Sequence, residues 1–195
     1  MKLLFVLLFS YLLGSIPIGL LVAKFKGIDI RRYGSGNIGA TNVFRILGTG
    51  PGLIVLIGDM IKGIIAVWVG GAIEGPNLAL IAGLTAIAGH SWSIFLNFSG
   101  GKGVATAGGV LLALAPGVVA VALAVWVTIV VLFRYVSLAS IIAAITVPFL
   151  MVLFGKPWSL FGFGLLAAVL IIYRHKPNIK RLLAGKELKI GDNTR

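Results

Sequence analysis

The hydrophobic residues of this chain are concentrated in long, nearly continuous runs separated by short polar segments. Six runs are present, at 3–23, 51–73, 77–97, 104–133, 136–154 and 157–173. A helix that crosses a bilayer needs about 20 mainly apolar residues. The pattern therefore predicts an all-α fold, a polytopic membrane helical bundle.

The composition agrees with this pattern. The chain is 59% hydrophobic, its mean hydropathy is +1.09, and 11% of its residues are charged, against about 25% in soluble domains. One bundle would use almost the whole length, so we expect a single integral membrane domain over 1–195. The first run is expected to be a retained span, because LGSIPIG has no clear signal-peptide cleavage site and further spans follow.

The basic residues predict the topology. Five of them lie between the first two runs and seven in the tail: Lys24, Lys26, Arg31, Arg32 and Arg45, then Arg174, Lys176, Lys180, Arg181, Lys186, Lys189 and Arg195. Basic segments tend to stay in the cytoplasm. Both segments should therefore be cytoplasmic, with an even number of crossings between them.

An even number requires the run 104–133 to cross twice or not at all, and Pro116-Gly117 offers a break inside it. Splitting there predicts seven transmembrane helices, with the N-terminus outside and the C-terminus cytoplasmic. The piece 104–115 would be about 18 Å long as a helix, which is short for a bilayer core of about 30 Å. We therefore expect it to begin earlier, near Gly101, or to lie where the membrane is thinned.

Two polar, glycine-rich segments fall on the predicted cytoplasmic side: GSGNIGATN (34–42) and GHSWSIFLNFSGGKGVATAGG (89–109). Glycine lets a ligand approach the backbone closely, successive N–H groups can form a nest for an anion, and a helix starting after the loop adds its positive end. Close helix packing is the plainer explanation for glycine in membranes. Because amide, hydroxyl and cationic side chains accompany these glycines, anion binding is the favoured interpretation.

Several functional classes lack their signatures. Gly103 stands where a Walker A loop has Ser or Thr, which excludes an ATPase of that type. The chain has five acids and no cysteine, and the acids are not grouped as hard cations favour. No metal, cofactor or nucleic-acid partner is expected. A transporter of phosphorylated small molecules is the alternative function, since glycine- and proline-interrupted spans occur there too.

Three ionisable features leave alternatives open. His90 and His175 each end an apolar run, where a general base and an interface packing role are equally plausible. Asp59 and Lys62 lie one helical turn apart inside a span, and they favour a structural ion pair over a substrate role for Lys62. The tail segment HKPNIKRLLAGKE predicts a short surface helix capped by Gly185.

The two glycine segments, with Arg45, and the tail segment together resemble the three cytoplasmic motifs of the bacterial PlsY family, over nearly the entire chain. The resemblance implies an enzyme that moves a fatty acyl group from acyl phosphate to the 1-hydroxyl of glycerol 3-phosphate. The products would be lysophosphatidic acid and phosphate. It also implies that acyl-CoA and acyl carrier protein are not donors, that PlsX supplies acyl phosphate, and that the site faces the cytoplasm from the bacterial inner membrane.

The resemblance further implies roles for individual residues. Those expected to be catalytic are Ser35, Arg45, His90, Lys102, His175 and Asn178. Those expected to bind substrate or shape its loops are Gly36, Asn37, Gly39, Thr41, Asn42, Gly100, Gly101, Gly103 and Thr106. Glu187 is expected to be structural. The general base stays open between His90, His175 and a substrate phosphate.

Overall fold

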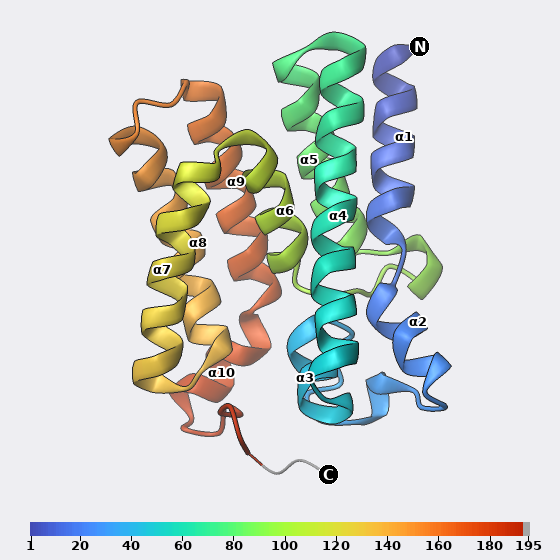
Figure 1. The fold of residues 1–195 in the computed structure, drawn as a ribbon, viewed down its shortest axis with the longest axis vertical. Helices are drawn as coiled ribbons and strands as arrows, with labels where there is room; N and C mark the ends of the chain where they lie inside the picture. Colours follow the sequence, from blue (N-terminus) through green and yellow to red (C-terminus); the bar gives the residue numbers. More distant parts are fainter. Residues whose placement is uncertain (193–195) are drawn as a thin grey trace. The chain divides into compact units, whose positions relative to one another are not determined.

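The computed structural model describes residues 1–192, which fold into helices in two compact units (Figure 1). The first unit is Met1–Val110 with the tail from Gly191, and the second is Leu111–Ile190. The all-helical prediction is confirmed for the described residues, where an isolated β-bridge joins Ser93 and Ser99. Arg195, counted above among the tail cations, lies outside them.

The first unit is built on helices α1 (Lys2–Ser15), α4 (Thr49–Glu74) and α5 (Pro76–Ser91), which lie side by side (Figure 1). Small residues let α1 and α5 approach closely: a Cβ added to Gly14 would collide with the backbone of Ala86, and one added to Gly89 with the backbone of Tyr11. The shorter elements are α2 (Ile18–Phe25), η1 (Ile30–Arg32), α3 (Ala40–Leu47) and η2 (Ile94–Leu96).

The first apolar run is broken into two helices. Helix α1 ends at Ser15 and α2 begins at Ile18, because Pro17 has no N–H to continue the helical hydrogen bonds. Together Lys2–Phe25 still form a stretch of 24 residues long and apolar enough to cross a membrane. At this break the carbonyl of Ser15 accepts from Ser93 Oγ, and the carbonyl of Ile16 accepts from Lys62 Nζ.

The second unit packs α7 (Pro116–Phe133) on α8 (Val136–Leu153) and α8 on α9 (Trp158–Arg174), with the short α10 (Lys176–Leu183) at the end of α9. Helix α6 (Val104–Leu114) precedes α7, so the predicted break at Pro116 is confirmed. The expectation that this helix begins near Gly101 is wrong. Gly103 has φ +79°, which a right-handed helix cannot contain, so α6 begins after it.

By length and composition the described helices include four candidate membrane spans: Lys2–Phe25, Thr49–Glu74, Pro116–Phe133 and Val136–Leu153. The pair α9 and α10, bent by 60°, would be a fifth. Helices α5, of 16 residues, and α6, of 11, are shorter. Many large apolar side chains are exposed, among them Trp68, Leu132 and Trp158, as expected for surfaces that face lipid. Seven spans and their orientation stay predictions.

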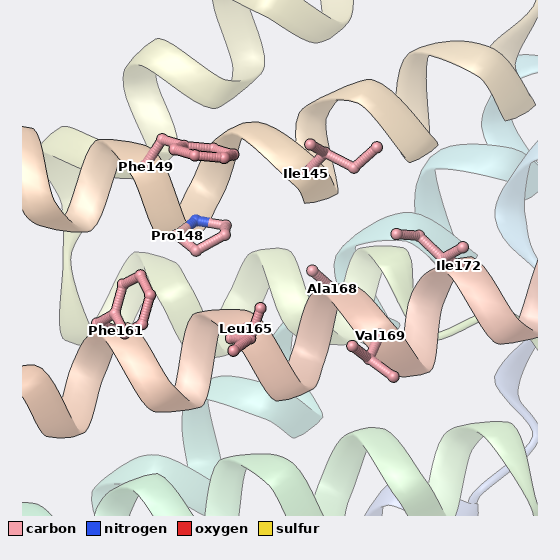
Figure 2. A pocket seen from close by; sticks show the side chains of 8 residues that line it. All are labelled: Ile145, Pro148, Phe149, Phe161, Leu165, Ala168, Val169 and Ile172. Atoms are coloured by element: carbon pink, nitrogen blue, oxygen red, sulfur yellow. The ribbon is translucent and has the colours of Figure 1, made fainter.

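An apolar groove of about 180 Å³ runs between α8 and α9 within the second unit (Figure 2). The side chains that line it are Ile145, Pro148, Phe149, Phe161, Leu165, Ala168, Val169 and Ile172. The lining offers no polar atom, so the groove suits hydrocarbon and not a phosphate group.

Candidate functional site

The first glycine segment is a loop organised around one buried amide, that of Asn42. Its side chain is 1% exposed. Its Oδ1 accepts the Ser35 N–H at 3.0 Å, and its Nδ2 donates to the carbonyls of Tyr33 at 3.0 Å and Asn37 at 2.9 Å. Asn42 therefore holds the loop in shape, and its amide hydrogens are already used inside the protein.

This loop leads directly into the N-terminus of α3. Gly36 has φ +70°, a conformation that favours glycine, and Asn37 Oδ1 accepts the Gly39 N–H at 2.8 Å. Gly39 is the N-cap of α3. Thr41 is exposed, while Ser35 and Arg45 are half-buried. The polar side chains expected to meet substrate thus lie on a short helix start and the loop before it.

The charges of the stretch 24–45, which contains this loop, suit an anionic partner. This stretch holds five cations and one acid, Asp29. The hydrogen bond from the Arg31 guanidinium holds the pKa of Asp29 at about 2, although desolvation opposes it. Asp29 is therefore ionised at neutral pH, and the stretch keeps a positive net charge.

The second glycine segment leaves the end of α5 and folds back onto it. The Gly101 N–H donates to the His90 carbonyl at 3.1 Å, and the first atom that a Cβ on Gly101 would meet is His90 Nε2. Gly103 then turns the chain into α6, and Thr106 lies fully buried in its first turn. One part of the predicted anion nest needs correction, because the Gly101 N–H is bonded to His90 and does not face a ligand.

Beneath this segment lies a cluster of three ionisable side chains, Asp59, Lys62 and His90, each at most 5% exposed. Lys62 Nζ lies 2.8 Å from Asp59 Oδ1 and 2.8 Å from His90 Nδ1. The predicted ion pair of Asp59 and Lys62 is therefore confirmed. That His90 completes the cluster was not predicted.

Polar side chains of α1 tie the second segment in place, and sequence reasoning missed them. Tyr11 Oη donates to the Trp92 carbonyl at 2.6 Å, Ser93 Oγ to the Ser15 carbonyl at 2.6 Å, and Ser15 Oγ to the Gly89 carbonyl at 3.3 Å. The available signal was the presence of polar residues inside the first apolar run, where each needs a partner.

The two glycine segments share one hydrophobic core in the first unit. Leu96, from the second segment, packs against the cluster that contains Ile38 and Val43 of the first. The structure therefore brings these two segments into one region, as the sequence predicts. Among the described residues, no three His, Asp or Glu side chains come together in a way that could hold a metal ion.

The third motif belongs to the second unit. His175, 2% exposed, lies with Nδ1 at 2.8 Å from the Ile171 carbonyl. A carbonyl can only accept, so Nδ1 carries the proton and Nε2 of the neutral ring is the basic nitrogen. Asn178 donates from Nδ2 to Glu187, and its buried Oδ1 has no hydrogen-bond partner among the described residues.

Helix α10 is capped by Gly185, as the sequence predicts. This glycine has φ +65°. The Lys186 N–H donates to the Arg181 carbonyl at 2.8 Å and the Gly185 N–H to the Leu182 carbonyl at 3.1 Å. The two bonds form a Schellman motif, so the cap prediction is confirmed. The cap turns the chain so that Glu187 returns to α10.

Glu187 is the structural centre of this motif, which confirms its expected role. Its carboxylate, 6% exposed, accepts from Asn178, from Ser137 Oγ at 2.7 Å and from Arg181 Nε at 2.7 Å. Burial opposes its ionisation, but these hydrogen bonds outweigh burial, and the pKa of Glu187 is below its usual value.

Replacing Glu187 by Gln is expected to destabilise the protein by roughly 1–3 kcal/mol near neutral pH, the size of hydrogen bonds to a charged group. A carboxyl whose folded pKa is lowered stabilises above its unfolded pKa, which is 4.5, and loses that contribution as the pH falls through the folded pKa. The difference in unfolding midpoint between wild type and Glu187→Gln should therefore shrink below that pH. The exposed Glu74→Gln is the control, and a difference independent of pH would contradict the assignment.

The sequence model of the family "Glycerol-3-phosphate acyltransferase" matches residues 4–185. Glycerol-3-phosphate acyltransferase 2 of Moorella thermoacetica is 53% identical over 189 residues, which cover 96% of this chain and 97% of that protein. The glycerol-3-phosphate acyltransferase of Desulforudis audaxviator is 53% identical over 179 residues, 91% of this chain and 90% of that protein.

Solved structures extend the similarity to the fold. The crystal structure of PlsY (YgiH), an integral membrane glycerol 3-phosphate acyltransferase, in its glycerol 3-phosphate form has a TM-score of 0.93 with 43% identity, and it covers 98% of this chain and 96% of that chain. The lysophosphatidic acid form of PlsY has a TM-score of 0.92 with 42% identity and the same coverage. The similarity thus includes both sequence and architecture over nearly the whole chain.

Proposed function

This chain belongs to the glycerol-3-phosphate acyltransferase family, and on that premise we propose that it transfers a fatty acyl group from acyl phosphate to the 1-hydroxyl of glycerol 3-phosphate. The products are lysophosphatidic acid and inorganic phosphate, in the first acylation of phospholipid biosynthesis. The observation that carries the proposal is the 43% identity to PlsY in its glycerol 3-phosphate form. Membership in this family favours acyl transfer over the transporter alternative.

An acyl phosphate donor explains why the chain has no His-x4-Asp dyad of the kind found in other acyltransferases. The substrate hydroxyl attacks the acyl carbon, the bond from that carbon to the phosphate oxygen breaks, and phosphate leaves with the bonding electrons. An acyltransferase of the His-x4-Asp type needs a carboxylate five residues after its His, and here Phe95 follows His90 and Lys180 follows His175 at that spacing. A mixed anhydride needs no such dyad, because its leaving group is good. Positioning two phosphates and stabilising the oxyanion are the main requirements.

We assign the phosphate contacts to cations and helix starts of the two glycine segments. Arg45 and Lys102 supply the positive charge, and Ser35 and Thr41 supply hydroxyl groups beside the start of α3. Asn37, Gly36, Gly39, Gly100, Gly103 and Thr106 shape the loops around them. Asn178 adds an unpartnered carbonyl oxygen that suits a substrate hydroxyl.

For the proton of the attacking hydroxyl, His175 is the better of the two histidines. Its Nε2 is the basic nitrogen, because Nδ1 donates to Ile171. A substrate phosphate dianion remains the other acceptor. Loss of a general base would lower kcat by about 10²–10⁴. A loss of this size in His175→Gln at saturating substrates would identify His175 as the base, whereas little change would favour the substrate phosphate.

We propose that seven segments cross the bilayer. This number counts the two short helices α5 and α6 as spans in addition to the longer ones, although they are only about 24 Å and 16 Å long at 1.5 Å per residue. The N-terminus is then outside, and the C-terminus and the site face the cytoplasm of a bacterial cell, at its inner membrane. The enzyme PlsX supplies acyl phosphate from that side.

The donor is tested with purified protein in detergent, offered glycerol 3-phosphate with palmitoyl phosphate or with palmitoyl-CoA. We expect phosphate and lysophosphatidic acid to appear with the acyl phosphate and no product with the thioester. Transfer from palmitoyl-CoA at a comparable kcat/KM would refute the donor assignment. No transfer from either, in protein with a normal unfolding transition, would refute the proposed activity.

A further inference from the structure

The ammonium of Lys62 lies close to three polar atoms. They are Asp59 Oδ1 at 2.8 Å, His90 Nδ1 at 2.8 Å and the Ile16 carbonyl at 3.3 Å. The Ile16 carbonyl lies at the break between α1 and α2, where it also accepts the Ile18 N–H at 3.1 Å. Lys62 is thus a buried cation whose polar neighbours come from three different segments.

This arrangement determines the protonation of the His90 ring. An ammonium can donate but not accept, so the Nδ1 atom 2.8 Å from Nζ must present its lone pair. Two facing N–H groups at that distance would repel each other. Lys62 Nζ forms an ion pair with Asp59 Oδ1, and the contact from Asp59 Oδ1 to His90 Nδ1, at 3.4 Å, is longer than that pair.

We propose that Asp59 and Lys62 are positioning residues that hold His90 as the neutral tautomer with its proton on Nε2. The ring then presents that N–H to the side of Gly101 where a Cβ would be. It cannot take a proton from substrate through either nitrogen. His90 therefore supports the second glycine segment, while His175 carries the opposite tautomer.

The position of the second glycine segment depends on the orientation of the His90 ring. The His90 carbonyl accepts the Gly101 N–H at 3.1 Å, and the ring lies where a Cβ of the same residue would be. The next residues are Lys102 and Gly103, which precede α6. A ring free to rotate would no longer stay packed against Gly101, and the loop before α6 would lose its defined position.

The tautomer can be measured directly, because the chain has two histidines. Protein labelled with ¹⁵N-histidine is studied by NMR near neutral pH in detergent, and His175→Gln assigns the signals. We expect His90 to show protonated Nε2 and unprotonated Nδ1, and His175 the reverse. A proton on His90 Nδ1, alone or together with one on Nε2, would overturn the proposal, whatever the activity of the protein.

The consequence for catalysis rests on the proposed function and has its own test. The double variant Asp59→Leu/Lys62→Met removes the donor to Nδ1 without leaving a buried unpaired charge. We expect its KM for glycerol 3-phosphate to rise about tenfold, a loss of about 1.4 kcal/mol, with a smaller change in kcat. Its unfolding midpoint should stay near that of wild type. Lys156→Met serves as the control for removal of one cation.

A conservative change of His90 separates positioning from proton transfer. The side-chain amide of His90→Gln can place an N–H near the position of Nε2, but it cannot act as a base. We expect this variant to keep kcat within about tenfold of wild type, whereas loss of a general base would cost about 10²–10⁴. An unchanged KM in the Asp59→Leu/Lys62→Met variant, or a kcat loss of that larger size in His90→Gln, would refute the positioning role.

Discussion

Substituting Ala for Gly101 is expected to lower kcat/KM for acyl transfer by at least about 100-fold, the cost of misplacing a reacting group by about 1 Å. The new methyl group would overlap the His90 ring at Nε2. That ring cannot move aside, because Lys62 holds Nδ1 at 2.8 Å and the side chain is 5% exposed. The glycine segment must move instead, and it carries Lys102. The measurement is phosphate release at varied glycerol 3-phosphate.

Gly108→Ala is the matched control for this variant. Gly108 lies in α6 a few residues further along, and nothing lies within 4 Å of the position a Cβ would take. Alanine is also the better helix former, by about 0.8–1.0 kcal/mol, so Gly108→Ala should retain wild-type transfer. Equal activity of Gly101→Ala and Gly108→Ala would show that the close contact with His90 is not needed for catalysis.

Features that depend on a short stretch of chain could be predicted from the sequence. Apolar runs gave the helices, Pro116 gave the start of α7, and Gly185 gave the cap of α10. Each follows from the backbone of a few neighbouring residues: proline lacks an N–H, and glycine tolerates positive φ. The placement of each glycine segment before a helix, α3 or α6, was predictable for the same reason.

Contacts between distant positions could not be predicted. Lys62 meets Ile16 across 46 positions and His90 across 28, and no local pattern signals such a pair. The role of Asn42 is a related case. The resemblance placed it with substrate-binding residues, but its side chain bonds within the loop at Ser35, Tyr33 and Asn37. A polar residue in a motif does not reveal whether its partner is a ligand or the loop itself.

The start of α6 shows why a run of apolar residues does not fix where a helix begins. The run of apolar residues suggested that α6 extends back toward Gly101 to gain length. The structure instead uses Gly101 and Gly103 to build the turn, because the Gly101 N–H bonds to His90 and Gly103 has positive φ. A short helix beside a polar loop is tolerated where protein, and not lipid, surrounds the backbone.

Replacing one residue of the buried Asp59–Lys62 ion pair is expected to have the largest effect on the stability of the protein. Lys62→Met leaves the carboxylate of Asp59, 2% exposed, without its cation, and removing one partner of a buried pair costs about 3–5 kcal/mol. The carbonyl of Ile16 also loses the hydrogen bond from Lys62, although it keeps the one from the Ile18 N–H. The measurement is the unfolding midpoint in detergent.

The control is the double variant Asp59→Leu/Lys62→Met, which replaces both charges with apolar side chains. Replacing a whole buried pair is often neutral or stabilising, in contrast to removing half of it. We therefore expect the double variant to unfold well above Lys62→Met, although it has one more substitution. If the double variant were the less stable of the two, the cost would come from lost packing or from the Ile16 bond and not from an unpaired charge. A recovered midpoint together with a raised KM would show that this buried pair serves the position of His90 more than the stability of the fold.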